Sequence, residues 1–218
     1  MQTALTLPEE IVLLSLDDDT GRPVGRAGMT PDLALAGAIV MELALAGRVD
    51  SDRNRLFVTN AAPTGDAVAD AALARLAAPG APTDARGAIP LLARDVTAAR
   101  EAVLDGLVVR GILRRVEGRV LWVFANRRFP KAPGRVETVE ARTRLRVLLL
   151  AEGIPEPRDA LLLGLARAAG LLPLLFSAEE LARIQPWLGV VTRIESLNRS
   201  LGAAVAEART TGLHGGHS

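Results

Sequence analysis

Apolar residues recur along this chain mostly at helical spacing. The stretch between Asp32 and Gly47 is apolar on nearly every side of a helix, which is typical of a helix buried in a core. Gly47 is expected to end it, because glycine readily adopts the left-handed conformation found just past helix C-termini. Further helices are predicted at 6–16, 66–77, 90–110, 136–152, 157–169, 177–185 and 190–209. The pattern therefore predicts a mainly α fold.

Three helix starts have explicit capping signals. Thr6-Leu7-Pro8-Glu9 and Ser177-Ala178-Glu179-Glu180 have the spacing of capping boxes, in which a hydroxyl and a glutamate satisfy free backbone amides. Asp66 follows a Pro/Gly loop and is expected to be an N-cap.

Two short β-hairpins are predicted, each after a helix and a glycine. The first covers 48–58. In the second, Ile112-Leu113 leads through a turn at Glu117-Gly118 into a strand from Val120 to Phe124. Alternation would place Val120, Trp122 and Phe124 on one face of that strand and Leu121 and Val123 on the other. A two-stranded hairpin cannot bury both faces, so the domain core, a bilayer interface or another subunit is expected to cover one.

The length suits one domain. We expect a single compact multi-helix domain at 1–209 with one or two hairpins, a flexible linker at 78–87 and a flexible tail at 210–218. The recurring order of helix, glycine and hairpin is an internal pseudo-repeat of two copies, too few for a solenoid.

The composition disfavours catalysis. The chain has no cysteine and no tyrosine, and its two histidines, His214 and His217, lie in the glycine-rich tail. Thiol and histidine nucleophiles and histidine-ligated zinc are thereby disfavoured, and no glycine-rich phosphate loop occurs. The acids at 17–19 lack the spacing of a calcium loop, and a helix end or an arginine partner is the simplest account of Glu42. We expect no enzyme activity, no cofactor and no metal.

The ends and apolar stretches indicate a cytoplasmic protein. The N-terminus has acids where a signal peptide needs a basic start. Neither of the two most apolar stretches of the chain reaches the ~20 residues that span a bilayer. Association with the inner face of a membrane would be peripheral.

Positive charge is concentrated between Arg94 and Arg135. This window has ten basic and four acidic side chains, a net charge of +6, whereas the whole chain has a net charge of +1. Such a surplus could attract a polyanion, although a solvated basic face without a ligand is an equally simple interpretation.

Four segments in order resemble the Golgi phosphoprotein 3 family, phosphoinositide-binding adaptors with bacterial relatives. They are LTLPEEIVLLSLDDDTG from Leu5, LALAGAIVMELALAGRV from Leu33, APTGD from Ala62 and AREAVLDGLVVRGIL from Ala99 with its hairpin. The chain looks like a bacterial-type member. The resemblance implies a helical single domain, an apolar hairpin used at membranes and in self-association, and no catalysis.

In the eukaryotic members a tryptophan and three arginines bind phosphatidylinositol 4-phosphate. By this resemblance the tryptophan position falls at Ala27, two arginine positions fall at Ala36 and Thr97, and the third is kept as Arg100. Arg26 and Arg94 lie beside lost positions. The expected head-group site is therefore Arg100 with Arg94 and Arg26, and the expected membrane or oligomer contact is Val120, Leu121, Trp122, Val123 and Phe124.

These features predict a non-enzymatic peripheral membrane or adaptor protein that binds anionic phospholipid or phosphoinositide head groups. A homo-oligomer is expected, and a protein partner is possible. One alternative is an oligomeric scaffold without a lipid ligand. Another is a winged-helix-like DNA-binding protein, but the helix that would read bases is largely apolar, so a nucleic acid partner is disfavoured.

Overall fold

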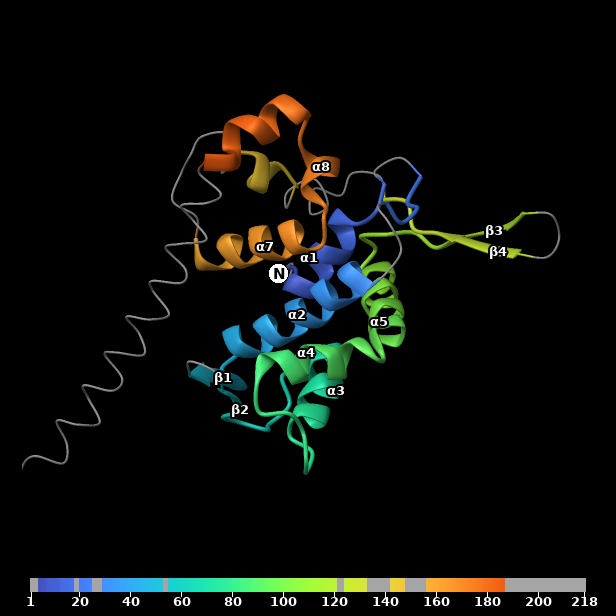
Figure 1. Cartoon of the computed structure of the whole chain (residues 1–218). Coiled ribbons are helices and arrows are strands. Elements are labelled where there is room, and N and C mark those ends of the chain that lie inside the picture. The colour runs from blue at the N-terminus through green and yellow to red at the C-terminus, as the bar shows by residue number, and fades with distance from the viewer. Residues whose placement is uncertain are drawn as a thin grey trace, which may run out of the picture.

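The chain folds into a body of packed helices with two β-hairpins (Figure 1). The computed structural model describes residues 4–17, 20–24, 29–52, 55–120, 124–132, 142–147 and 156–186. Its helices are α1 (Leu7–Leu14), α2 (Met29–Leu45), α3 (Ala67–Leu76), α4 (Ala85–Ala93), α5 (Val96–Val109), α7 (Pro157–Ala168) and α8 (Leu172–Leu175). Residues 142–147 and 178–186 are also helical. The mainly α fold predicted from the sequence is confirmed.

The strands form two separate antiparallel pairs. β1 (Val49–Asp52) pairs with β2 (Arg55–Val58), and β3 (Val116–Val120) pairs with β4 (Phe124–Arg128). In Figure 1 the first hairpin lies against the helical body, whereas β3–β4 extends away from it.

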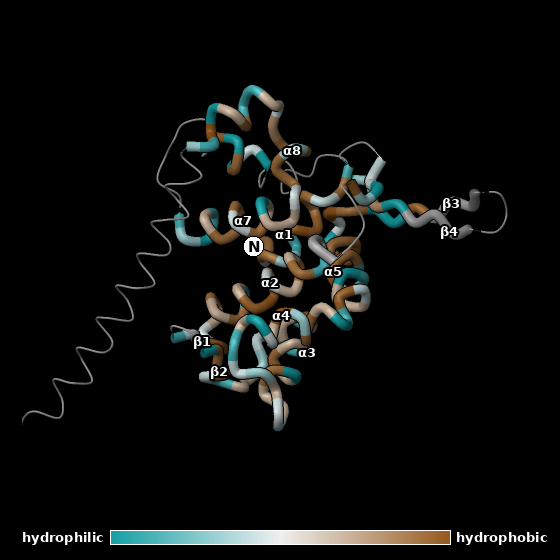
Figure 2. Tube along the Cα trace, viewed as in Figure 1, coloured by the Kyte–Doolittle hydropathy of each residue, from teal (hydrophilic) through white to brown (hydrophobic). Residues whose placement is uncertain are grey.

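The central element is α2, which packs against α1, α3, α4, α5 and α7. Its residues 34–40 are all buried, as the apolar pattern predicted. Figure 2 shows hydrophobic residues where α1 and α5 meet it. A helix surrounded on so many sides has no room for a polar face, which explains why its sequence lacks one.

Two apolar clusters make up the core, and α1 contributes to both. Val12 and Leu13 join a cluster with α2 to α5 and the base of the second hairpin. Leu7, Ile11 and Leu14 join another with α7, α8 and the segments 142–147 and 178–186. All eight residues of α1 are buried, so this short helix lies between the two halves of the molecule.

The capping predictions are confirmed. The Glu9 amide donates to the Thr6 hydroxyl at 3.4 Å, and the Thr6 amide donates to Glu9 Oε2 at 2.8 Å. Ser177 and Glu180 form the same reciprocal pair, and the Asp66 carboxylate accepts from the Ala69 amide at 2.8 Å.

The pseudo-repeat has a backbone explanation. Gly47 and Gly111 have φ values of 64° and 68° and end α2 and α5. The following amides, of Arg48 and Ile112, donate back to the carbonyls of Leu43 and Leu107 at 2.8 and 2.9 Å. Both ends are Schellman motifs, which cap free carbonyls and turn the chain into the hairpin.

The prediction of one helix over 90–110 is wrong, and so is the extent of the linker at 78–87. α4 begins at Ala85, because the Asp84 carboxylate caps it by accepting from the Gly87 amide at 2.8 Å. It ends at Ala93, and α5 starts separately at Val96. Pro90, the predicted helix start, lies inside α4.

The predicted second hairpin has the wrong register. Glu117 and Gly118 lie within β3, not in a turn, and pair with Arg127 and Asn126. Val120 pairs with Phe124, so the apolar run is not one strand and its alternation does not define two faces. Leu121, Trp122 and Val123 lie between the paired ends, outside the described residues. Ile112-Leu113 instead pairs near the base, through the bridge from Leu113 to Lys131.

Beyond Pro130, the described part confirms the helices predicted at 157–169 and 177–185. The helix predicted at 190–209 and the tail at 210–218 lie outside it. None of the described helices is long and apolar enough to cross a membrane.

Gly21 allows the loop after α1 to touch the base of the second hairpin. Its φ is 64°, its carbonyl accepts from the Phe129 amide at 2.9 Å, and a Cβ here would overlap the backbone of Phe129 and Pro130. Gly47 has the same φ, but open space surrounds its Cβ position.

We predict that Gly47→Ala lowers the free energy of unfolding by about 1 to 2 kcal/mol, the cost of a left-handed non-glycine residue. Gly21→Ala should lower it by a further 1 to 3 kcal/mol, roughly, because overlap adds to that cost. Urea unfolding of both variants measures the difference, and equal losses would show that the Gly21 contact does not constrain the fold.

Candidate functional site

Arg100 lies just over one turn into α5 and is already paired. Its Nη2 atom donates to Oδ1 of Asp32 at 2.9 Å, and each side chain is 35% exposed. Asp32 lies in the first turn of α2. The arginine that the family resemblance keeps is therefore accessible to a ligand but faces a carboxylate.

Two other described positions that the resemblance assigns to the family's pocket, Thr97 and Ala36, hold no charge. Thr97 is exposed one turn before Arg100 on α5, so both share a helix face. Ala36 is 0% exposed within the core cluster around α2, where the small side chain fits between helices. Ala27 lies outside the described residues.

Of the two substitute arginines, one lies among the described residues. Arg94 is exposed and is the C-cap of α4, immediately before the start of α5. The next residue, Asp95, makes no cap hydrogen bond to α5 and instead forms an ion pair with Arg75. Arg26 lies outside the described residues.

The net positive charge between Arg94 and Arg135 is partly neutralised in the folded structure by acidic side chains from elsewhere in the chain. Arg110 pairs with Glu9 of α1 at 2.7 Å, and Arg100 pairs with Asp32 of α2. Both acids lie outside the sequence window that was counted. Arg115 pairs with Asp105 and lies over the Phe129 ring, 5.8 Å from its centroid. Acids from other elements thus neutralise part of the predicted patch.

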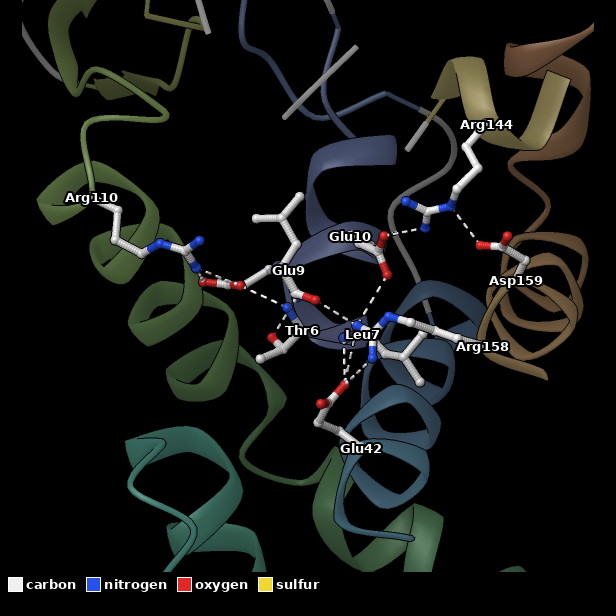
Figure 3. Close-up of polar contacts among 10 residues, drawn as sticks. Thr6, Leu7, Glu9, Glu10, Glu42, Arg110, Arg144, Arg158 and Asp159 are labelled. Atoms are coloured by element: carbon white, nitrogen blue, oxygen red, sulfur yellow. Dashed lines mark hydrogen bonds and ion pairs between the residues drawn. The ribbon is translucent and has the colours of Figure 1, made fainter. Parts of the chain in front are cut away.

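The densest polar cluster surrounds the start of α1 (Figure 3). Glu10 is 2% exposed, and its two carboxylate oxygens accept from Arg144 and Arg158, the latter at 3.2 Å. Arg144 also pairs with Asp159 of α7. A buried carboxylate is tolerated when charged hydrogen bonds replace its water shell, and here two guanidinium groups do so.

Glu42 and Glu9 complete this cluster. Glu42 Oε2 accepts from the Leu7 amide at 2.7 Å and from Arg158 Nη1 at 3.4 Å. A helix end and an arginine both satisfy it, which confirms the simple interpretation of the sequence. Glu9 binds Arg110 with both oxygens, at 2.7 and 2.8 Å.

Sequence reasoning missed the part of this cluster formed around Glu10. Its partners Arg144 and Arg158 lie 134 and 148 residues away along the chain. The local signal at 6–9 predicted only the capping box, and no spacing rule connects residues at such separations. A buried helix with two adjacent acids in its first turn was the available clue, because each acid needs a partner.

Burial raises the pKa of Glu10 above its ordinary value, and the hydrogen bonds and charges of Arg144 and Arg158 oppose that shift. Every described carboxylate of the cluster is bound to an arginine. The arrangement holds helices together.

The described residues contain no group of three or more His, Cys, Asp or Glu side chains that could hold a metal ion. A groove of 310 Å³ between α3 and α5 has alanines on its walls, with the Arg75 and Asp95 pair as its charged groups. A second groove of 390 Å³ lies beside β2 and is lined mainly by apolar residues.

The family model described as Golgi phosphoprotein 3 (GPP34) matches residues 7–211. No curated protein matches the chain significantly.

The Glu10 cluster generates a stability prediction. Arg144→Ala should lower the free energy of unfolding at pH 7 by about 2 to 3 kcal/mol, because it leaves Glu10 buried with one partner fewer. Adding Glu10→Gln should recover part of the loss. Since the pKa of Glu10 is raised above 4.5, the folded state holds its proton where the unfolded chain has released it, and stability falls as pH rises through this interval.

The loss caused by Arg144→Ala should therefore be smaller near pH 5 than at pH 7. Urea unfolding of the wild type and of the single and double variants at both pH values measures this. A loss independent of pH that Glu10→Gln does not reduce would contradict the role assigned to the buried carboxylate.

Proposed function

Because the chain belongs to the Golgi phosphoprotein 3 (GPP34) family, we propose that it is a non-enzymatic adaptor that binds anionic head groups on a membrane surface. The observation that carries the proposal is that Arg100, which the family resemblance assigns to phosphate binding, is a partly exposed arginine on α5. Guanidinium groups bind phosphate through charge-assisted hydrogen bonds.

Neighbouring exposed bases support a surface contact. Arg94 at the start of α5 and Arg114 at the base of the second hairpin are both exposed. Such charges attract an anionic surface without forming a pocket. Arg26 belongs to the proposed site by its place in the sequence. With two pocket arginines replaced by Ala36 and Thr97, phosphatidylinositol 4-phosphate is one candidate ligand among several anionic lipids.

The hairpin supplies the second element of the proposal. β3–β4 extends away from the helical body in Figure 1, and its strands are joined by Leu121, Trp122 and Val123. An apolar sequence with a tryptophan suits the interface between head groups and acyl chains, where aromatic rings concentrate. The same residues, with Val120 and Phe124, could instead contact a second copy, so a homo-oligomer remains part of the proposal.

These contacts would be made by a cytoplasmic protein at the inner face of a membrane. The DNA alternative has little support, because Val96, Val103, Leu104 and Leu107 of α5 are buried in the core. On the exposed side of α5, Asp105 is paired with Arg115, and Ala98 and Ala102 offer no hydrogen bond to a base edge.

Arg100→Ala should reduce binding to vesicles of phosphatidylcholine doped with phosphatidylglycerol or phosphatidylinositol 4-phosphate by about tenfold, the worth of one charged hydrogen bond to phosphate. Co-sedimentation measures it. Arg55→Ala is the matched control, since it removes an equal charge from exposed β2 of the other hairpin. Equal losses would indicate diffuse attraction, and no binding by the wild type would leave a scaffold without a lipid ligand.

Trp122→Ala should weaken vesicle binding or self-association while leaving the melting temperature unchanged within a few degrees, because its ring is proposed to contact a partner and not the core. Co-sedimentation, light scattering and thermal unfolding test this together. A large fall in melting temperature would show that the tryptophan belongs to the core.

A further inference from the structure

The guanidinium group assigned above to an anionic ligand already faces a carboxylate of the same chain. Arg100 and Asp32 lie 2.9 Å apart, each about one third exposed, and their helices α5 and α2 pack together. Neither side chain is on a loop, so a ligand that reaches Arg100 meets Asp32 at a position defined by two helices.

This geometry makes the energy of binding depend on ligand charge. A negative ligand is attracted by Arg100 and repelled by Asp32, and both energies grow in proportion to its charge, so Asp32 cancels more of the binding energy of a doubly charged ligand. A phosphate monoester carries about −1.5 to −2 at pH 7, whereas a phosphodiester carries about −1. Asp32 therefore opposes a monoester more strongly than a diester.

The other described positions do not offset this repulsion. Thr97 supplies a hydroxyl and Ala36 is fully buried, so neither adds a positive charge. Of the described bases assigned to the site, Arg100 meets Asp32, and Arg94 is a further exposed base. Asp32 therefore removes part of the advantage that the arginines would give a doubly charged ligand.

We propose that Asp32 is a selectivity residue, which lowers the preference that Arg100 alone would give the site for doubly charged phosphate monoester head groups over singly charged phosphodiester head groups. This inference rests on the proposed function. It assigns the carboxylate a role against one class of ligand, in addition to its ion pair in the free protein.

The test compares two vesicle types, phosphatidylcholine doped with phosphatidylglycerol or with phosphatidylinositol 4-phosphate. Asp32→Asn should raise affinity for the diester vesicles by about threefold, because repulsion between an exposed carboxylate and one unit charge lowers affinity by up to about fivefold. It should raise affinity for the monoester vesicles by about tenfold, because their head group carries nearly twice the charge. Asparagine has the same shape as aspartate but no charge, and thermal unfolding checks that the fold persists.

Asp105→Asn is the matched control. Asp105 is an exposed acid on the same α5 helix, paired with Arg115, and its substitution changes the net charge equally. It should raise both affinities by a similar small factor and leave their ratio unchanged. A ratio shifted as much as by Asp32→Asn would overturn the proposal, because total charge would then explain the selectivity.

The double variant Asp32→Asn with Arg100→Ala should lose the monoester gain, since that gain requires the freed guanidinium. If the wild type binds vesicles but Asp32→Asn leaves the ratio unchanged, the inference fails and the proposed function stands. If no variant binds either vesicle, both fail. Inorganic phosphate should displace the protein from vesicles more strongly than chloride of equal ionic strength, because it would occupy the same guanidinium, and equal effects of the two salts would contradict a phosphate site at Arg100.

Discussion

The fold depends on burying two adjacent glutamates in a helix of eight residues. Burial of α1 brings Leu7, Ile11 and Leu14 into one apolar cluster and Val12 and Leu13 into the other, but it also takes Glu9 and Glu10 out of water. Uncompensated, such charges would cost several kcal/mol each. Each instead meets arginines carried by other elements, Arg110 from α5 and Arg144 and Arg158 from the C-terminal half. The same pairs that remove the penalty determine how these elements sit around α1.

That arrangement has a direct effect on the candidate site. α5 is held at one end by the pairing of Arg110 with α1 and along its length by burial of Val103, Leu104 and Leu107. Its opposite side is left exposed on a rigid support, and there Arg100 meets Asp32 of the central helix. Preorganised side chains lose little entropy on binding, so even a sparse site on such a support can discriminate between ligands.

Much of the fold could be predicted because its signals are local. The capping box at Thr6, the all-round apolar pattern of α2 and the helix stop at Gly47 each lie within a few turns of chain. The hairpin register was wrong because Val-Leu-Trp-Val-Phe has strand-forming residues throughout, and only cross-strand pairing shows that Val120 and Phe124 face each other. The start of α4 at Ala85 was missed because Asp84 was not recognised as a cap.

The candidate site was harder to foresee, because its charges pair across the fold. Counting bases between Arg94 and Arg135 could not include Asp32 or Glu9, which reach that surface only when α1 and α2 pack on α5. The family resemblance located Arg100 but said nothing of its carboxylate neighbour. Ligand chemistry is set by such neighbours, and they are encoded in tertiary packing and not in motif spacing.

The glycine that ends α2 and the glycine that ends α5 have a consequence for how this architecture can change over evolution. Each hairpin leaves its helix in a direction set by main-chain hydrogen bonds to Leu43 and Leu107, not by the side chains of the hairpin. Substitutions in β3 and β4, which extend away from the helical body, can therefore accumulate without changing the direction in which the second hairpin leaves α5. A related protein that keeps the helix and its terminal glycine can therefore change the side chains at the hairpin tip, and so its binding partner, while the core that positions the hairpin remains the same.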